Sequence, residues 1–282
     1  MQVKLSANNM PINDKFEKYI TYIEIDGMKI RYASIGSGRP LFMLHGWGGD
    51  LHSWKPLAGY LSKKKYKIFS LDMPGFGKSA MPKKAWCIAD YSAFIEKFVQ
   101  KIYTKYGLKG GYNVVVHSFG GRVILKLFET PGDLKSPTLN RIVFIAPAGI
   151  KHSLSFSKRV LQNIAKFGAG IFDLPPLRLF KRSARKLMYG ILRVHDYENT
   201  SGVMRKTFLN VIGEDLTGNL EQINCPTLIV WGTDDTYVPV SDAYIMDDKI
   251  KNSSLKIIKG GRHGIHKTHA KEIGGWIDEF IG

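Results

Sequence analysis

Three residue types that cooperate in nucleophilic catalysis follow apolar runs in this chain. Ser118 ends a run of valines, His263 lies in a glycine-rich loop, and the adjacent Asp234 and Asp235 occupy a turn. A serine hydroxyl is a poor nucleophile until an imidazole accepts its proton, and the imidazole needs an acid to fix its tautomer and stabilise its cation. The sequence therefore predicts acyl-transfer chemistry at Ser118, with His263 as the base and one of the two aspartates as the acid that orients it.

The pattern around Ser118 predicts a sharp turn between a strand and a helix. The segment reads Val-Val-Val-His-Ser-Phe-Gly-Gly at 114–121, and helical spacing follows from 122 to 130 before a Pro-Gly pair. Gly120 and Gly121 would let the helix approach the sheet where a Cβ would collide. A serine here also suits an ordinary helix N-cap, so this segment alone leaves both interpretations open.

The other histidines are weaker candidates for the base. His263 is favoured because loops at strand ends are where ligand-facing groups converge. His117 should point away from the serine that it precedes. His266 and His269 fall on the last predicted helix, with no carboxylate or cysteine pattern that would indicate a metal site.

Eight predicted strands alternate with helical segments along most of the chain. The strands lie near residues 19–26, 28–34, 40–44, 66–71, 114–116, 139–145, 227–231 and 255–258. This alternation predicts an α/β fold with a doubly wound, mainly parallel eight-stranded sheet, whose ligand sites lie beyond the carboxyl ends of the strands. An Asp-Gly turn at 26–27 joins the first two strands as a hairpin.

A helical insertion interrupts this pattern. From 147 to 224 the strand signal disappears and apolar residues recur at helical spacing. We therefore expect a core of residues 1–146 and 225–282, with residues 147–224 inserted as a helical cap. Apolar cap residues suggest an apolar acyl or aromatic group beneath the cap; they are Leu154, Phe156, Leu161, Ile164, Phe167, Phe172, Leu177, Leu179 and Phe180.

Composition narrows the classes of partner without selecting one. The 41 basic residues against 24 acidic ones leave a net charge of +17, which attracts polyanions of any kind. Because no zinc-finger, RNA-binding or helix-turn-helix pattern accompanies this charge, no specific nucleic-acid partner is expected. One predicted cap helix carries a basic stripe, formed by Arg178, Lys181, Arg182, Arg185 and Lys186. A solvated helix face explains the stripe, and docking on an acidic membrane surface or guidance of an acidic substrate is the alternative.

Several further features bear on location and cofactors. The N-terminal residues lack the apolar stretch of a signal peptide, and the two cysteines, Cys87 and Cys225, are far apart in the sequence. We therefore expect a cytoplasmic protein.

Two glycine-rich segments resemble nucleotide-binding motifs, but Asp72 stands where a P-loop requires glycine, and Pro82 interrupts the helix of a dinucleotide site. No cofactor is expected, and the oligomeric state stays open.

Five segments, in this order, resemble landmarks of the α/β-hydrolase superfamily. They are His-Gly-Trp-Gly-Gly at 45–49, Asp-Met-Pro-Gly-Phe-Gly-Lys-Ser at 72–79, the serine segment at 114–121, Gly-Thr-Asp-Asp at 232–235 and the histidine loop at 260–264. The chain order of serine, acid and histidine is also that of the family. Val116 departs from the family's Gly-x-Ser-x-Gly elbow, in which the first position is glycine.

The resemblance implies roles for particular residues. It implies a triad of Ser118, Asp235 and His263, because the family's Gly-x-x-Asp turn selects Asp235, whereas Asp234 would stabilise the turn. It also implies an oxyanion hole formed by the backbone N–H groups of Trp47 and Phe119. His45 would then be a structural hydrogen-bonding residue, and the 72–79 segment would shape a loop near the site.

These residues predict a serine hydrolase that cleaves small or medium carboxylic esters or lactones, with a substrate that carries an apolar portion. Relatives that open epoxides or displace halides use an aspartate nucleophile, so Ser118 argues against those reactions. Relatives that cleave carbon–carbon bonds in diketone-like compounds typically carry tryptophan after the catalytic histidine, where this chain has Gly264. That reaction and a slow-turnover ligand receptor are the alternatives.

Overall fold

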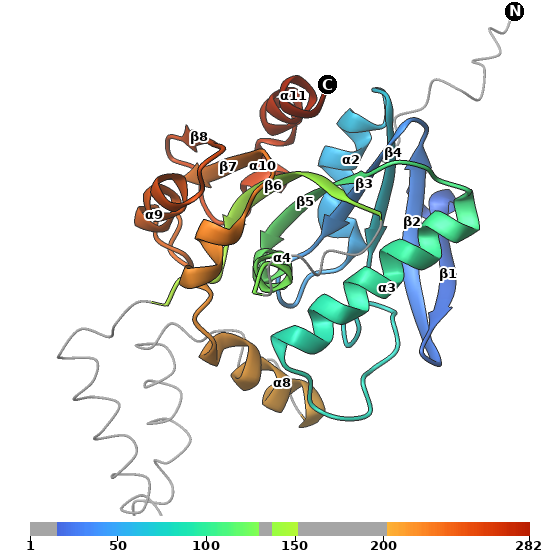
Figure 1. Cartoon of the computed structure of the whole chain (residues 1–282). Helices are drawn as coiled ribbons and strands as arrows, with labels where there is room; N and C mark the ends of the chain where they lie inside the picture. The colour runs from blue at the N-terminus through green and yellow to red at the C-terminus, as the bar shows by residue number, and fades with distance from the viewer. Residues whose placement is uncertain (1–15, 130–136, 152–201) are drawn as a thin grey trace, which may run out of the picture.

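The computed structural model describes residues 16–129, 137–151 and 202–282 (Figure 1). In chain order its elements are η1 (Phe16–Tyr19), β1 (Ile20–Ile25), β2 (Met28–Gly36), β3 (Arg39–Leu44), η2 (Leu51–Trp54), α2 (Lys55–Leu61), β4 (Tyr66–Leu71), α3 (Ile88–Tyr106), β5 (Tyr112–Ser118), α4 (Phe119–Leu127), β6 (Leu139–Pro147), α8 (Gly202–Gly213), η5 (Thr217–Gln222), β7 (Thr227–Gly232), α9 (Ser241–Lys249), β8 (Ser253–Ile258), α10 (Ile265–Thr268) and α11 (Ala270–Ile281).

One eight-stranded sheet organises the described residues. Its strand order is β1-β2-β4-β3-β5-β6-β7-β8. The β1–β2 and β2–β4 pairs are antiparallel, and every pair from β4–β3 to β7–β8 is parallel. The predicted doubly wound, mainly parallel sheet of eight strands is therefore confirmed. Strand β5, which ends at Ser118, lies between β3 and β6 near the middle of this sheet.

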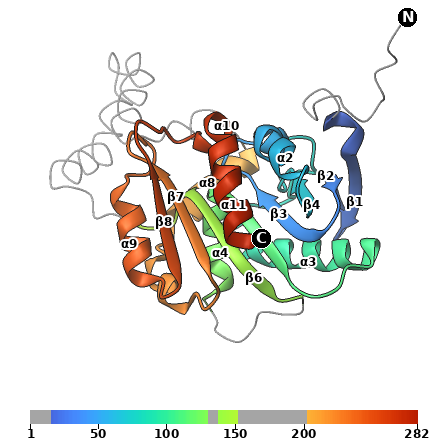
Figure 2. The ribbon, with the colours of Figure 1, turned by 90° about the horizontal axis from the view of Figure 1, so that it is seen from above.

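The alternation of side chains along the strands divides the core between the two faces of the sheet. On β5, Val114 and Val116 pack into a cluster with α3 and α4, whereas Val115 packs into a second cluster with α2 and α11. All three valines are fully buried. A strand covered on both faces must be apolar at consecutive positions, which is why this run of valines is unbroken. Figure 2 shows the sheet with α2 and α11 on one side and α3 and α4 on the other.

Two helical segments are each divided into two elements. The segment after β3 begins as η2, whose N-cap Asp50 accepts from the His52 N–H at 3.0 Å, and continues as α2 with Pro56 in its first turn. The segment after β8 is divided into α10 and α11, because His269 breaks the helical dihedrals between them.

Only the end of the predicted cap lies within the described residues. Helices α8 and η5 confirm helical structure over part of 202–224. The nine apolar cap residues and the basic stripe named above lie outside the described residues, so the cap and its boundaries stay a prediction. Helix α8 is drawn below α4 in Figure 1, and Arg122 of α4 contacts it.

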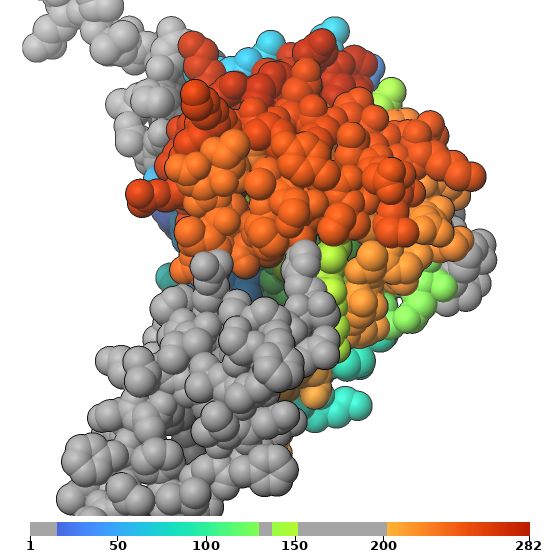
Figure 3. Space-filling view, turned by 90° about the vertical axis from the view of Figure 1, so that its left-hand side faces the viewer, coloured from blue at the N-terminus to red at the C-terminus, as the bar shows by residue number. Residues whose placement is uncertain are grey.

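The C-terminal elements form one block of the molecule. In the space-filling view the segment from β7 to the C-terminus, drawn in orange and red, covers most of the upper part of the face shown (Figure 3). The predicted acid, Asp235, and the predicted base, His263, both lie in loops of this block. Within the described ranges, no helix combines the length and apolarity needed to cross a bilayer.

Candidate active site

Ser118 lies at a strained turn between β5 and α4. Its φ of 49° and ψ of −110° fall outside the regions that ordinary residues adopt. The turn is tight because a Cβ on Gly120 would lie 2.5 Å from the Leu44 carbonyl oxygen, and one on Gly121 would lie 2.3 Å from Cβ of Pro147. The elbow forms although Val116 replaces the family's glycine, because the Val116 side chain is fully buried in the sheet face.

Asp235 and His263 are brought together by the loops that follow β7 and β8. Oδ2 of Asp235 lies 2.7 Å from Nδ1 of His263, and the Asp235 side chain has no exposed surface. Its second oxygen, Oδ1, accepts from the N–H groups of Tyr237 and Val238 at 2.8 and 3.0 Å. These bonds direct the carboxylate at the imidazole. Asp234 is exposed and instead accepts from the Thr233 hydroxyl at 2.7 Å.

The His263 ring is held between two other rings. Tyr237 stacks on it at 5.0 Å between centroids, and His117 lies at 4.5 Å on a tilted plane. The His263 side chain is 18% exposed, which leaves part of it open to a substrate. No hydrogen bond joins Ser118 to His263 in the described residues, but both line one pocket. Such bonds are often long before substrate binds.

Two further histidines are buried close to His263. Nδ1 of His117 donates to the Ile145 carbonyl oxygen at 2.9 Å. Burial, together with the neighbouring His266 and His263 rings, holds the pKa of His117 well below its ordinary value. The His266 ring lies 4.0 Å from that of His117, and burial lowers the pKa of His266 to about 3. Both rings are therefore neutral at physiological pH.

The loop after β3 turns sharply beside Ser118. The Gly49 N–H donates to the Gly46 carbonyl oxygen at 3.0 Å, which places Trp47 and Gly48 inside a four-residue turn. The Trp47 ring packs edge-on against Phe76 and Phe119 and against Phe208 of α8, with centroid distances of 4.9 to 5.2 Å. Phe119 is the first residue of α4, where a helix leaves its N–H groups without an internal partner.

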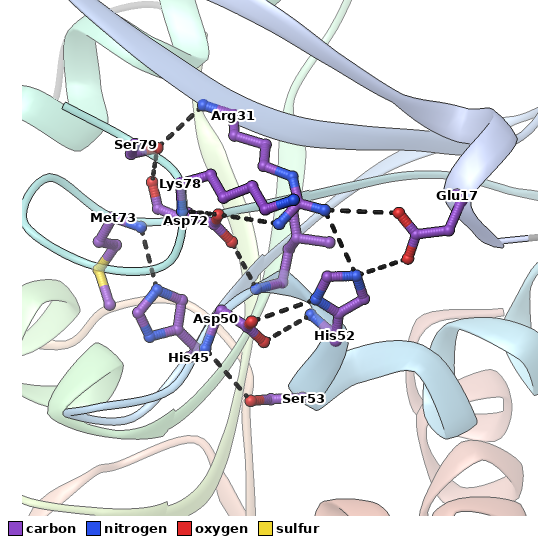
Figure 4. A network of polar contacts seen from close by, with 11 residues as sticks. Glu17, Arg31, His45, Asp50, His52, Ser53, Asp72, Met73, Lys78 and Ser79 are labelled. Carbon is purple, nitrogen blue, oxygen red and sulfur yellow. Dashed lines mark hydrogen bonds and ion pairs between the residues drawn. The ribbon is translucent and has the colours of Figure 1, made fainter.

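A network of polar contacts fixes this loop from behind (Figure 4). His45 donates from Nδ1 to the Gly46 carbonyl oxygen and accepts the Met73 N–H at Nε2, at 2.8 and 3.0 Å. The fully buried Asp72 accepts from the N–H groups of Leu51 and Lys78, each at 2.8 Å. Both ring nitrogens of His45 are therefore engaged in hydrogen bonds, which is consistent with a structural role.

Arg31 ties Asp72 to the N-terminal part of the chain. Its guanidinium lies 3.5 Å from Asp72 and 3.5 Å from Glu17, and its backbone N–H donates to the Ser79 hydroxyl at 2.9 Å (Figure 4). Only Arg31 and Asp72 of this set are buried, which favours their pairing. The 72–79 segment thus shapes the loop near the site, as the resemblance implied.

Ser118 lies where two hollows meet. One, of about 330 Å³, is the more polar of the two; this polar hollow is lined by His117, His263 and His266 together with the 46–49 loop. The other, of about 250 Å³, is lined by Trp47, Phe119 and residues of α8 such as Phe208, and also contains Arg122 and Asp242. Both hollows include Ser118, Trp47 and Tyr237.

The structure places the predicted Asp235 and His263 together beside Ser118, and it adds neighbours that sequence reasoning missed. His117 was expected to point away from Ser118 and was given no further role, but its ring contacts His263 and lines the polar hollow. Tyr237 was not singled out, although it lies two residues after Asp235 and stacks on His263. The described residues contain no cluster of His, Cys, Asp and Glu that could hold a metal ion.

Comparison with known proteins supports one family. The model of the alpha/beta hydrolase fold family matches residues 39–270. The chain is 26% identical to a putative non-heme chloroperoxidase of Synechocystis sp. over 274 residues, covering 89% of this chain and 94% of that protein. It is 25% identical to a pimeloyl-[acyl-carrier protein] methyl ester esterase of Legionella pneumophila, covering 90% of this chain and all of that protein.

A solved structure gives the same result for the fold. The bromoperoxidase from Bacillus anthracis superposes with a TM-score of 0.69 at 22% identity, covering 93% of this chain and 99% of that one. At this identity the likeness concerns the fold alone. The family match spans every segment that carries the site, from the loop after β3 to the histidine loop after β8. The chain therefore belongs to the alpha/beta hydrolase fold family.

Proposed function

We propose that this protein is a serine hydrolase that cleaves small or medium carboxylic esters through an acyl-enzyme. The observation that carries the proposal is the contact of 2.7 Å between Asp235 and His263 in the pocket that contains the strained Ser118. Membership in the hydrolase family and the likeness to an esterase support it. No cofactor is needed for this chemistry.

The reaction assigns a role to each residue. His263 accepts the proton of the Ser118 hydroxyl as its oxygen attacks the carbonyl carbon, and Asp235 stabilises the imidazolium that results. His263 then protonates the leaving alcohol. The N–H groups of Trp47 and Phe119 receive the negative charge that develops on the carbonyl oxygen. The turn at 46–49 and the start of α4 leave these two N–H groups outside regular backbone pairing, which supports the assignment.

The hollow lined by α8 indicates the acyl portion. Its aromatic and aliphatic walls favour an apolar group, and its volume of about 250 Å³ suits a short or medium chain. Lactones present the same carbonyl and remain within the proposed substrate class. Carbon–carbon hydrolysis is disfavoured by Gly264, which offers no side chain after His263.

We further propose that the enzyme acts in the cytoplasm, where its free cysteines, Cys87 and Cys225, stay reduced.

Covalent labelling tests the proposal without knowledge of the physiological substrate. A fluorophosphonate probe should modify wild-type protein at Ser118, as located by peptide mass mapping, and should not modify Ser118→Ala. His263→Ala should react at least about 100-fold more slowly. An ester panel of increasing acyl length, with matched lactones, then ranks substrates. Folded wild-type protein that neither reacts with the probe nor hydrolyses any panel member would contradict the proposal and favour a ligand receptor.

A further inference from the structure

The polar hollow beside Ser118 contains a second imidazole that the proposed reaction leaves unused. The His117 ring lies 4.5 Å from the His263 ring, and both line the hollow of about 330 Å³ together with Ser118. His117 is only 6% exposed, so its contacts in the folded protein are restricted to the surrounding residues and this hollow. One of its ring nitrogens, Nε2, has no role in the proposed reaction although the ring lies next to the proposed base.

The hydrogen bonds of His117 determine which nitrogen carries its proton. Because Nδ1 donates to the Ile145 carbonyl oxygen at 2.9 Å, the neutral ring has no proton on Nε2, which is an acceptor. Burial keeps the ring neutral. Among the described residues, both ring nitrogens of His266 are inaccessible to solvent and have no hydrogen-bond partner. Nε2 of His117 does not belong to this group of atoms. Because His117 also lines the hollow, an acceptor of fixed tautomer is available there.

His263 presents the same kind of group. Its Nδ1 faces Asp235, so Nε2 is the nitrogen that accepts a proton during catalysis. Two acceptor nitrogens on neighbouring rings therefore serve one hollow. A molecule that satisfies both must donate two hydrogen bonds from a single small group. Water does this, whereas an alcohol has one O–H and leaves one acceptor without a partner.

We propose that His117 is a positioning residue for the water that releases the acyl group, its Nε2 accepting one O–H of this water while His263 accepts the other. The proposal rests on the proposed function, because it concerns the second half of an acyl-enzyme reaction. It assigns a selectivity to the site: the acyl group passes to water in preference to alcohols.

Release of the acyl group conserves every atom and proton of the water. The water oxygen attacks the acyl carbonyl carbon and forms a new C–O bond, while one water proton moves to Nε2 of His263. The bond between that carbon and Oγ of Ser118 then breaks, and His263 returns the proton to Oγ. The second water proton stays on the attacking oxygen, donated to His117 throughout, and leaves with the carboxylic acid. With an alcohol, the oxygen carries carbon in place of this second proton.

The partition of the acyl-enzyme between water and methanol tests this role. A 4-nitrophenyl butyrate reaction in dilute methanol yields butyric acid and methyl butyrate, and their ratio reports only the step after acylation. His117→Asn keeps an amide N–H near the Ile145 carbonyl oxygen but has no atom at the position of Nε2. His117→Gln reaches that position with an acceptor oxygen. His269→Asn is the matched control, because His269 does not line the hollow.

We expect the ratio of methyl ester to acid to rise about five-fold in His117→Asn, the effect of one hydrogen bond, and to return to within about two-fold of wild type in His117→Gln. Because the ratio is measured on the active fraction, a lower yield of folded variant leaves the result readable. An unchanged ratio in active His117→Asn, or an equal rise in His269→Asn, overturns the proposal. Failure of the wild type to form either product contradicts the proposed function instead.

Discussion

Oδ2 of Asp235 lies 2.7 Å from Nδ1 of His263, although the two residues belong to loops that follow different strands. The loops meet because β7 and β8 are adjacent and parallel, so their carboxyl ends reach the same edge of the sheet. A Cβ on Gly232 would lie 2.1 Å from the Gly261 carbonyl oxygen, which shows how closely the two backbones approach. The geometry of the acid–base pair is thus determined by the sheet.

Replacing the acid should impair catalysis without unfolding the protein. In Asp235→Asn the amide no longer fixes the His263 tautomer or stabilises its cation, so we expect kcat on a 4-nitrophenyl ester to fall about 10⁴-fold. Asp234→Asn is the matched control, since Asp234 is exposed and bonded to Thr233, and its kcat should stay within about two-fold of wild type. A comparable loss in both variants would contradict the assignment of Asp235.

Glycines beneath the elbow should be intolerant of a methyl group. In Gly120→Ala the new Cβ would lie 2.5 Å from the Leu44 carbonyl oxygen, a backbone atom that cannot move aside cheaply. We expect a loss of about 2 to 3 kcal/mol in the free energy of unfolding, measured by urea titration. Gly218→Ala provides the control because nothing lies within 4 Å of its added Cβ. Equal stability of both variants would show that α4 is less closely packed on β3 than the structure indicates.

The sequence allowed the fold to be predicted, and it identified the residues of the candidate site, because both follow local patterns. Val114, Val115 and Val116 indicated a strand buried on two faces, and the glycines after Ser118 indicated the turn. The choice between Asp234 and Asp235 needed the family's motif, because two adjacent acids in a turn look alike until burial separates them. The contacts of His117 with His263 and of Tyr237 with the same ring depend on how separate loops pack, which no local spacing encodes.

Arg122 should anchor α8 beside the pocket. Its Nη1 donates to the carbonyl oxygens of Val211 and Glu214 at 3.0 and 2.9 Å, at the C-terminal end of the helix, where a cation is favourable. Arg122→Met removes both bonds from a buried position, so we expect unfolding to become easier by about 2 kcal/mol. Because Phe208 and Val211 line the apolar hollow, KM for longer acyl chains should rise more than KM for acetate esters.

Lys151 supplies the control for this anchor. Its Nζ donates to the Gly213 carbonyl oxygen at 3.1 Å, on the same helix end, but the side chain is exposed. Lys151→Met should therefore change the free energy of unfolding by no more than about 0.5 kcal/mol and leave KM unaltered. If the two variants behave alike, the burial of Arg122 is not what secures α8.

His266 should make the protein less stable as the pH falls. Burial lowers its pKa to about 3 in the folded state, from an ordinary value of 6.5, so between these values the unfolded chain binds a proton that the folded chain does not. The free energy of unfolding must then fall with decreasing pH, by about 2 kcal/mol from pH 7 to pH 5 through this residue alone. His117, whose pKa is also lowered, adds to the loss, and His263 and Lys267 are the other basic groups nearby.

Replacing His266 with phenylalanine should remove the part of the pH dependence that is due to His266. Both ring nitrogens of His266 lack a hydrogen-bond partner in the described residues, and the ring packs against Trp54 at 5.1 Å, so an apolar ring loses no bond. Urea titrations at pH 7 and pH 5 should show that His266→Phe loses about 2 kcal/mol less than wild type. His269→Phe, at a partly exposed position, should keep the wild-type difference. An identical pH dependence in wild type and His266→Phe would contradict the prediction. It would mean that His266 binds a proton in the folded protein as readily as in the unfolded chain, so that burial does not keep the ring neutral.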